Sequence, residues 1–233
     1  MDTGKIENLG IDRILKRGSG EIIAQRENAL FIRDSISGVY FLAGEDTAAG
    51  LSLMDSAAGR DCDQLVVTGY ALGMAVYERY GFTGRTECYQ VAYYGEKPPA
   101  GGIPNGRSGE NGWVIRTAEK SDCPVLEENY RLISPEEMEQ AVERKNVWMG
   151  YDNGRPVGFI GEHLEGSMGM LYVFPEARRK GYGMALQSHL IAKTMERGDI
   201  PYGQVVTDNK NSLALQERLG MKRSEDLVLW MWK

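Results

Sequence analysis

The sequence is poor in the residues from which metal sites and disulfide frameworks are built. It has three cysteines, Cys62, Cys88 and Cys123, which are widely spaced and form no CxxC motif. Its two histidines are His163 and His189. These counts argue against a disulfide framework and against a metal site, so we expect no metal. The chemistry of an active site must then come mainly from carboxylates, amides or the backbone.

Long apolar runs and basic blocks are also missing. No run approaches the ~20 apolar residues of a membrane helix, and the first residues, Met1 to Lys16, mix acids and bases where a signal peptide would be apolar. Lys and Arg number 27 and Asp and Glu 33, which gives a formal charge of −6. Nucleic-acid binding requires clustered cations. We therefore expect no nucleic-acid or membrane partner and a cytoplasmic location.

A segment rich in glycine and proline divides the chain. It has almost no large apolar side chains, so it cannot bury enough surface to order itself as a core. We predict a linker over residues 98–111, an N-terminal domain over 1–97 and a C-terminal domain over 112–233. Both predicted domains have an ordinary size.

An internal comparison suggests a duplication. Val66–Phe82 aligns without gaps with Val205–Met221, and seven positions are identical. The identical pairs are Val66/Val205, Val67/Val206, Thr68/Thr207, Ala75/Ala214, Glu78/Glu217, Arg79/Arg218 and Gly81/Gly220. Each segment is typical of a strand, a helix ended by glycine and a second strand. The alternative is that two common strand-helix-glycine patterns coincide.

The C-terminal part predicts alternating strands and helices. Ser134-Pro135-Glu136-Glu137 is typical of a helix start, and Asn153-Gly154 of a tight hairpin turn. The expected strands are 113–116, 147–151, 157–163, 169–174, 203–207 and 226–232, and the expected helices are 121–130, 134–145, 182–197 and 212–219. This order predicts a mixed sheet with helices, an α/β or α+β architecture.

One turn has the composition of an anion site. After the strand that ends at Phe174, the chain runs through Arg178, Arg179, Lys180, Gly181, Tyr182 and Gly183 into a helix. The glycines let backbone N–H groups point outward at the positive end of the helix dipole. With three cations on the same turn, the sequence predicts a cradle for a diphosphate. A solvated basic loop is the alternative interpretation.

The turn and a second motif resemble a known superfamily. Arg178-x-x-Gly181-x-Gly183 is similar to the signature of the GNAT superfamily of acyl-CoA-dependent N-acyltransferases, and Asn209-x-x-Ser212-x-x-Leu215 followed by Leu219-Gly220-Met221 is similar to its later helix. The stretch from Gly166 to Arg178 further resembles the glycine N-acyltransferase-like branch. The resemblance implies a GNAT fold in the C-terminal domain, preceded by a degenerate, truncated GNAT-like N-terminal domain.

The resemblance also implies which residues bind the acyl-CoA. The turn Arg178–Gly183 would hold the diphosphate, the main chain of Leu171, Tyr172 and Val173 would bond the pantetheine arm and the thioester carbonyl, and Asn209 and Ser212 would contact CoA or fix the loop. Gln216 takes the place of a tyrosine that many members carry in the late helix. Glutamine cannot supply a proton to the departing thiolate.

The acceptor amine must lose a proton, and the residues near the strand before the turn are candidates for receiving it. These are Glu165, Glu162 and His163, of which we favour Glu165. A charged hairpin tip is the alternative for all three. We expect transfer of an acyl group, acetyl first, from acyl-CoA to a small primary amine or amino acid; the alternative is a noncatalytic acyl-CoA-binding or regulatory module. A homodimer is compatible with the sequence.

Overall fold

The computed structural model describes residues 2–57, 62–101 and 112–233. The chain forms two compact units. The first contains Met1–Ala92, Tyr202–Leu213 and Lys222–Lys233, and the second contains Tyr93–Pro201 and Ala214–Met221. Within the described ranges, none of the helices combines the length and the apolar character that crossing a membrane requires. Most of the predicted linker, residues 102–111, lies outside the described residues.

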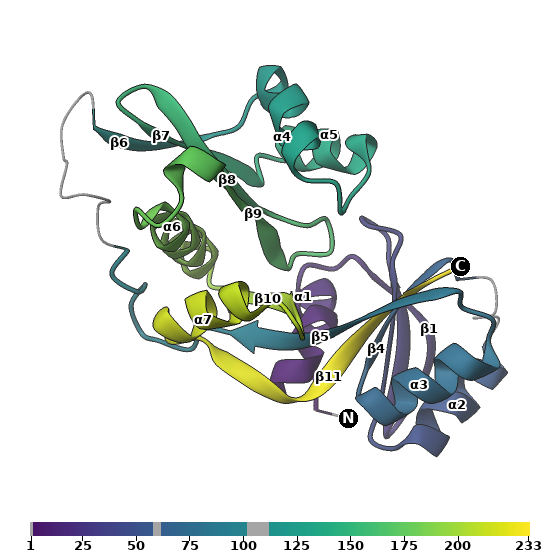
Figure 1. Ribbon diagram of the computed structural model, residues 1–233. Helices are drawn as coiled ribbons and strands as arrows, with labels where there is room; N and C mark the ends of the chain where they lie inside the picture. The colour runs from purple at the N-terminus through teal and green to yellow at the C-terminus, as the bar shows by residue number, and fades with distance from the viewer. Residues whose placement is uncertain (1, 58–61, 102–111) are drawn as a thin grey trace. The chain divides into compact units, whose positions relative to one another are not determined.

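The first unit is built on a twisted sheet (Figure 1). Its strands follow the spatial order β1-β2-β3-β4-β11-β5-β10, in which β3 and β4 are parallel and the other given pairs are antiparallel. The strands are β1 (Gly20–Arg26), β2 (Ala29–Asp34), β3 (Tyr40–Gly44), β4 (Gln64–Thr68), β5 (Gly84–Ala92), β10 (Tyr202–Val206) and β11 (Lys222–Trp232). The helices are the 3-10 turn η1 (Ile6–Asn8), α1 (Leu9–Lys16), α2 (Thr47–Ser56) and α3 (Tyr70–Arg79).

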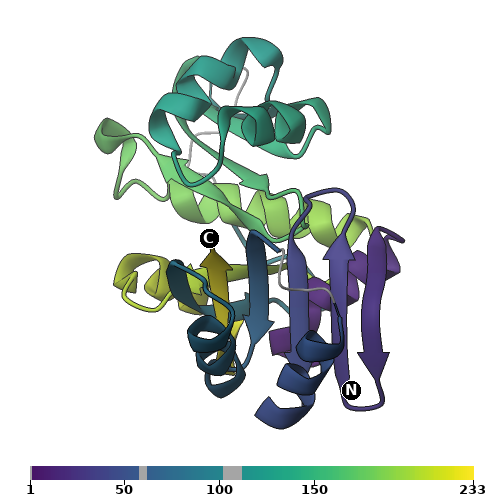
Figure 2. The same cartoon turned by 90° about the vertical axis from the view of Figure 1, so that its right-hand side faces the viewer.

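Strand alternation divides the core of this unit into two apolar layers. Phe31 and Leu42 face the cluster that includes residues of α2 and α3, whereas their neighbours Ile32 and Phe41 face the cluster that includes Ile11 of α1. Figure 2 shows α2 and α3 on one face of the sheet. Helices therefore cover both faces, which explains why the strands are buried on both sides.

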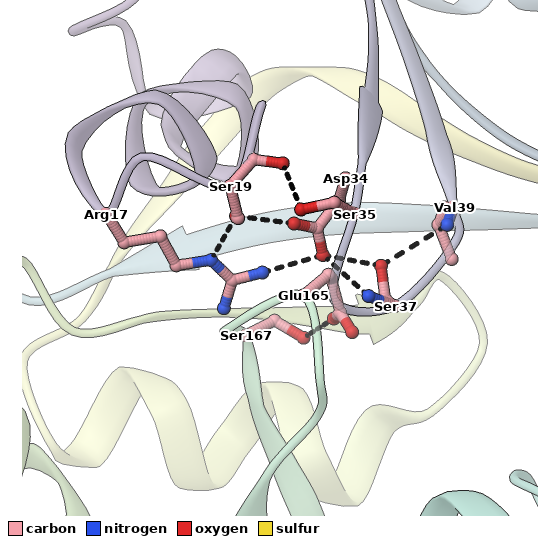
Figure 3. A network of polar contacts seen from close by, with 8 residues as sticks. All are labelled: Arg17, Ser19, Asp34, Ser35, Ser37, Val39, Glu165 and Ser167. Carbon is pink, nitrogen blue, oxygen red and sulfur yellow. Dashed lines mark hydrogen bonds and ion pairs between the residues drawn. The ribbon is translucent and has the colours of Figure 1, made fainter. Parts of the chain in front are cut away.

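A buried carboxylate lies at the end of β2. Asp34 is fully buried and accepts hydrogen bonds from Ser19 and Ser37, and it pairs with Arg17 at 2.6 Å (Figure 3). Although burial raises the pKa of Asp34, these hydrogen bonds and the charge of Arg17 outweigh it, so the pKa lies below its ordinary value. The carboxylate is satisfied by its neighbours, and we assign it a structural role.

The second unit has a smaller sheet in the order β9-β8-β7-β6 (Figure 1). All of its given strand pairs are antiparallel. Its elements are β6 (Trp113–Thr117), the 3-10 turn η4 (Lys120–Asp122), α4 (Cys123–Asn129), α5 (Pro135–Glu143), β7 (Val147–Asp152), β8 (Arg155–Glu162), β9 (Met168–Val173), the 3-10 turn η5 (Pro175–Ala177) and α6 (Tyr182–Glu196). Helix α6 packs on β8 and β9 through Ala185, Leu186, Leu190 and Ile191, which are all buried. Helix α7 (Lys210–Arg218) has its first residues in the first unit and its last in the second.

Several local predictions are confirmed. The Asn153-Gly154 turn has φ of 50° and 75°, as a hairpin turn of the primed type requires. The Ser134 side chain accepts a hydrogen bond from the N–H of Glu137 at 3.1 Å and caps α5. The element order in the C-terminal half is the predicted one, and the mixed α/β class is confirmed.

The pairing of the last strands differs from what two consecutive domains would give. Strands β4 and β5 flank α3 in the first aligned segment, and β10 and β11 flank α7 in the second. Yet β11 lies between β4 and β5, and β5 pairs with β10. The last strand of each segment therefore pairs with a strand of the other segment. As a result β10 and β11, which we had placed in the C-terminal domain, belong to the first compact unit.

Candidate active site

The predicted cradle lies between β9 and α6. Gly181 is the N-cap of α6 with φ of 90°, a left-handed conformation that glycine adopts without strain. It brings no capping side chain, and the first turn of α6 carries no acidic residue. Arg178, Arg179, Lys180 and Gly181 are all exposed. The turn thus presents the positive end of a 15-residue helix among exposed cations, as an anion site requires.

Two of the three cations also shape the loop. The Nε of Arg178 donates to the carbonyl of Val173 at 3.0 Å, and its guanidinium lies 5.6 Å from the centre of the Tyr172 ring. The Nζ of Lys180 donates to the carbonyl of Glu176 at 2.8 Å. Both side chains therefore fold back onto the turn and hold its backbone. Arg179 has φ of 61°, unusual for a residue with a side chain.

The remaining predicted contact residues have different roles. The Tyr182 side chain is buried, donates to Asp152 and packs on Trp113 at a ring distance of 5.3 Å, so only its backbone faces the turn. A Cβ at Gly183 would lie 3.6 Å from Val173 and 3.9 Å from Leu215, an ordinary packing contact. At α7, the side chain of Asn209 accepts from the N–H of Ser212 at 3.1 Å, so these two residues build a helix cap.

Strand β9 is bulged next to the cradle. The register with β8 shifts between Phe159 and Gly161, which leaves Met170 and Leu171 opposite a single residue. Met170 has φ of 53°. Tyr172 and Val173 are in register with β8, so the bulge frees the main chain at Leu171 rather than the whole predicted run. Bulges are frequent beside active sites because they re-aim backbone groups. Met170 and Leu171 are not residue types that mark a bulge, so this feature could not be predicted from the sequence.

A polar cluster gathers around His163. Its Nδ1 lies 3.8 Å from a carboxylate oxygen of Glu137 in α5, and its Nε2 lies 3.3 Å from the hydroxyl of Tyr130, the residue after α4. The Tyr130 and His163 rings are 6.0 Å apart. Glu137 was expected only as part of the helix start, and Tyr130 was not expected in the site. Their approach depends on the packing of α4 and α5, which sequence spacing does not encode.

The three predicted proton acceptors are not equivalent. Glu165 is buried and accepts a hydrogen bond from Ser167 (Figure 3). A carboxylate oxygen of Glu165, a carboxylate oxygen of Glu137 and a ring nitrogen of His163 all lie within 4.8 Å of one another. Glu162 is also buried, but it accepts from Thr194 at 3.1 Å and pairs with Arg197 of the turn that ends α6. The structure therefore brings Glu165 and His163 together and places Glu162 in a separate ion pair.

The electrostatics of the cluster favour proton transfer. Burial raises the pKa of Glu165, and the charge of His163 and the hydrogen bond from Ser167 only partly oppose it. Burial alone would lower the pKa of His163, but the carboxylate of Glu137, 3.8 Å from Nδ1, and the charge of Glu165 outweigh it, so that pKa lies above its ordinary value. Shifted carboxyl and imidazole groups in contact are typical of acid-base sites.

Gln216 has a free acceptor in a buried place. The side chain of this α7 residue is 6% exposed, and its Oε1 has no hydrogen-bond partner in the described part of the protein. The side chain of the preceding residue, Leu215, lies near the start of α6, where it would be 3.9 Å from a Cβ at Gly183. An unpaired buried oxygen in α7 fits a site that is completed by a ligand.

Gly169 leaves the space that the His163 ring occupies. A Cβ at this position would lie 2.3 Å from Nε2 of His163. Because Glu137 and Tyr130 hold the ring, we expect Gly169→Ala to force it out and to lower the free energy of unfolding by ~1–3 kcal/mol. Chemical denaturation measures this loss. Gly183→Ala is the control, because a methyl group fits there, and it should unfold at the same denaturant concentration as wild type or higher. An equal loss of stability in both variants would show that the space at Gly169 is not what His163 requires.

Comparison with known proteins identifies the fold. The profile of the FR47-like protein family matches residues 152–231, from the β7–β8 turn to β11. A crystal structure of a Drosophila protein superposes with a TM-score of 0.67 at 16% identity, covering 98% of this chain and 90% of that one. A GCN5-related N-acetyltransferase-like protein from Streptococcus suis superposes with a TM-score of 0.57 at 17% identity, covering 95% and 93%.

A GCN5-related N-acetyltransferase from Kribbella flavida gives a TM-score of 0.55 at 13% identity, covering 98% of this chain and 94% of that one. The chain has the GNAT fold. No curated protein sequence matches it. In this GNAT fold the cradle between β9 and α6, the bulge in β9 and the cap of α7 all lie within the residues that the family profile matches.

Proposed function

We propose that this protein transfers an acyl group, acetyl in the first instance, from acyl-CoA to the primary amine of a small molecule or amino acid. The observation that carries the proposal is the exposed turn at Gly181, which places cations and the positive end of α6 at one point after the bulged strand β9. A diphosphate is the anion that such a turn fits best.

The thioester would lie along β9. With the diphosphate on the turn, the pantetheine arm runs beside the last residues of this strand, and the main chain at Leu171, outside the paired register, is placed to bond the thioester carbonyl. Such a bond strengthens as the carbonyl oxygen gains charge in the transition state. The neighbouring carbonyl of Val173 is already engaged by Arg178, so it serves the loop and not the substrate.

The acceptor amine attacks only as the free base. A C–N bond forms, the C–S bond breaks, and the proton lost by the nitrogen needs an acceptor. Glu165 and His163 provide one, because they are close together and their pKa values are raised by burial and by neighbouring carboxylates respectively. Glu162 pairs with Arg197 and accepts a hydrogen bond from Thr194, so we assign it no role in proton transfer.

The departing thiol has a neighbour in Gln216. Its buried Oε1, which has no partner among the described residues, can accept one hydrogen bond from the bound CoA, but Gln216 supplies no proton. Thiolates are good leaving groups because ordinary thiols have a pKa of about 8.5. Loss of the usual tyrosine is therefore compatible with turnover.

A thiol-release assay with acetyl-CoA and a panel of amines and amino acids tests the proposal. We expect turnover with at least one acceptor and expect Glu165→Gln to lower kcat by ~10–100-fold with unchanged affinity for CoA, because the amide can neither take up a proton nor stabilise a protonated His163. The control is Glu143→Gln, an exposed residue at the end of α5. Measurable CoA binding without turnover on any acceptor would favour a noncatalytic acyl-CoA-binding module.

We further propose that the chain descends from two copies of one GNAT-like domain and belongs near the glycine N-acyltransferase-like branch. In support, the aligned segments share their strand-helix-strand order, and Gly81 and Gly220 end the two helices with φ of 73° and 76°. An amino-acid acceptor in the panel above tests the branch. Light scattering tests whether the protein is a homodimer.

A further inference from the structure

Three polar side chains stand in line in the second unit. The imidazole of His163 lies in the middle. Its Nδ1 is 3.8 Å from the carboxylate of Glu137, and its Nε2 is 3.3 Å from the hydroxyl of Tyr130. Each comes from a different segment: the first turn of α5, the residue after β8 and the residue after α4. The absence of a side chain at Gly169 leaves room for the ring in this orientation.

This order of groups is suited to moving a proton. In the neutral imidazole Nδ1–H donates toward Glu137, and Nε2 is left to accept from the Tyr130 O–H. When Nε2 takes up a proton, the carboxylate of Glu137 stabilises the imidazolium. Glu165, the other carboxylate that faces His163, acts in the same direction. The tautomer follows from these partners.

Tyr130 joins the line to the bulged strand. The main chain of Met170, the residue with positive φ in the bulge, partly opposes the rise in the pKa of Tyr130 and so lies beside its hydroxyl. Burial raises the pKa of Tyr130 to about 12, so at neutral pH it is an un-ionised phenol. One hydroxyl thus lies between His163 and the part of β9 where we place the thioester carbonyl.

We propose that Tyr130, His163 and Glu137 form the relay that takes the proton from the acceptor amine. The inference rests on the proposed function. As the amine nitrogen bonds to the thioester carbon, its N–H proton passes to the Tyr130 oxygen while the phenol proton passes to Nε2 of His163. The C–S bond then breaks, CoA leaves as a thiolate, and the imidazolium releases its proton to solvent. Tyr130 is the catalytic residue, and Glu137 is a positioning residue.

Activity measurements test the relay on the full chain with acetyl-CoA and the best amine of the panel. Tyr130→Phe should lower kcat by ~100-fold or more, with KM for acetyl-CoA changed by less than about twofold. Tyr151→Phe is the matched control, because it removes another phenol of the second unit, one that bonds Arg116. Equal kcat for Tyr130→Phe and Tyr151→Phe would overturn the relay.

The pH profile gives a readout that loss of structure would not imitate. His163 accepts a proton only when neutral, so the rate should rise with pH through its pKa. Glu137 raises that pKa. In Glu137→Gln the rising limb should therefore move to lower pH, corresponding to an acid dissociation constant about tenfold larger. A limb at the same pH as wild type would contradict the role of Glu137.

NMR separates the failure of the relay from the failure of the proposed function. The chain has two histidines, so His189→Gln leaves the imidazole signals of His163 alone to be titrated without substrate. In this background Glu137→Gln should lower the His163 pKa; an unchanged titration would overturn the relay. If the titration shifts as expected but no acceptor is acylated, the proposed function fails and the relay fails with it.

Discussion

A chain that ends at Met221 is expected to lose its cooperative unfolding transition, although it lacks only the last strand. Strand β11 lies between β4 and β5, so its removal leaves two neighbouring strands without their partner in the middle of the sheet. The sequence predicts that this strand lies in the C-terminal domain, residues 112–233. In the structure it is a central strand of the first unit.

The loss can be estimated from the buried side chains of β11. Val228, Leu229 and Met231 are at most 1% exposed, and burying each contributes ~1.5–3 kcal/mol. A polar ladder is lost as well, because the indole of Trp230 donates to Gln204 at 2.7 Å and Gln204 donates to Gln90 at 3.0 Å. These losses are comparable with the whole free energy of unfolding of a domain, ~5–15 kcal/mol.

Circular dichroism during thermal unfolding measures the effect. The control is a chain that lacks only Lys233, which follows β11. We also expect the predicted C-terminal domain, residues 112–233, not to fold alone, since its β10 and β11 lose β5 and β4. A cooperative transition near the wild-type temperature in either shortened chain would show that the strand exchange is not needed for stability.

The second large effect concerns the cradle: Gly181→Glu is expected to lower the affinity for CoA by ~100-fold or more. The new carboxylate stands where the diphosphate is expected, and opposed like charges cost several kcal/mol. The left-handed φ of 90° adds strain for any residue with a side chain. Isothermal titration calorimetry with CoA measures the change.

Gly198→Glu is the control for this substitution. Gly198 follows the other end of α6 with φ of 79°, and a Cβ there meets no atom within 4 Å, so strain and charge are matched while the cradle is intact. We expect its affinity for CoA to remain within about threefold of wild type, since the added charge is a helix length away and largely screened. Equal losses in both variants would point to strain in α6 rather than to the cradle.

The local structure of the C-terminal half could be predicted from the sequence because its signals are short-range. The Ser134 cap and the Asn153-Gly154 turn act on residues within a few positions, and both are found where they were expected. The conformation of Gly181 follows in the same way from a glycine before a helix. Such features depend on backbone sterics and neighbouring hydrogen bonds.

The sequence could not predict which strands pair. Whether β11 lies beside β10 or between β4 and β5 is decided by long-range packing, and the continuous apolar run of β11 is compatible with either place. The same limit applies to the site. His163 was a candidate from its place in the chain, but its partners Glu137 and Tyr130 come from segments that only tertiary packing brings together.

The sequence also did not predict where the side chains of the candidate residues point. The basic residues of the turn were expected to point at an anion, whereas Arg178 and Lys180 bond carbonyls of their own loop. Glu162 and Glu165 are close in sequence, but one meets Arg197 and the other Ser167. Glu162 is the last residue of β8, whereas Glu165 lies in the turn before β9, and the sequence does not define this strand boundary.

Calorimetric titration of wild-type protein with CoA, dephospho-CoA and pantetheine addresses the diphosphate cradle most directly. Pantetheine lacks the diphosphate, and dephospho-CoA retains it. We predict one binding site per chain for CoA and dephospho-CoA, and an affinity for pantetheine lower by ~100-fold or more, since several charge-assisted hydrogen bonds are lost. Equal binding of pantetheine and CoA, or no binding of CoA, would contradict the account.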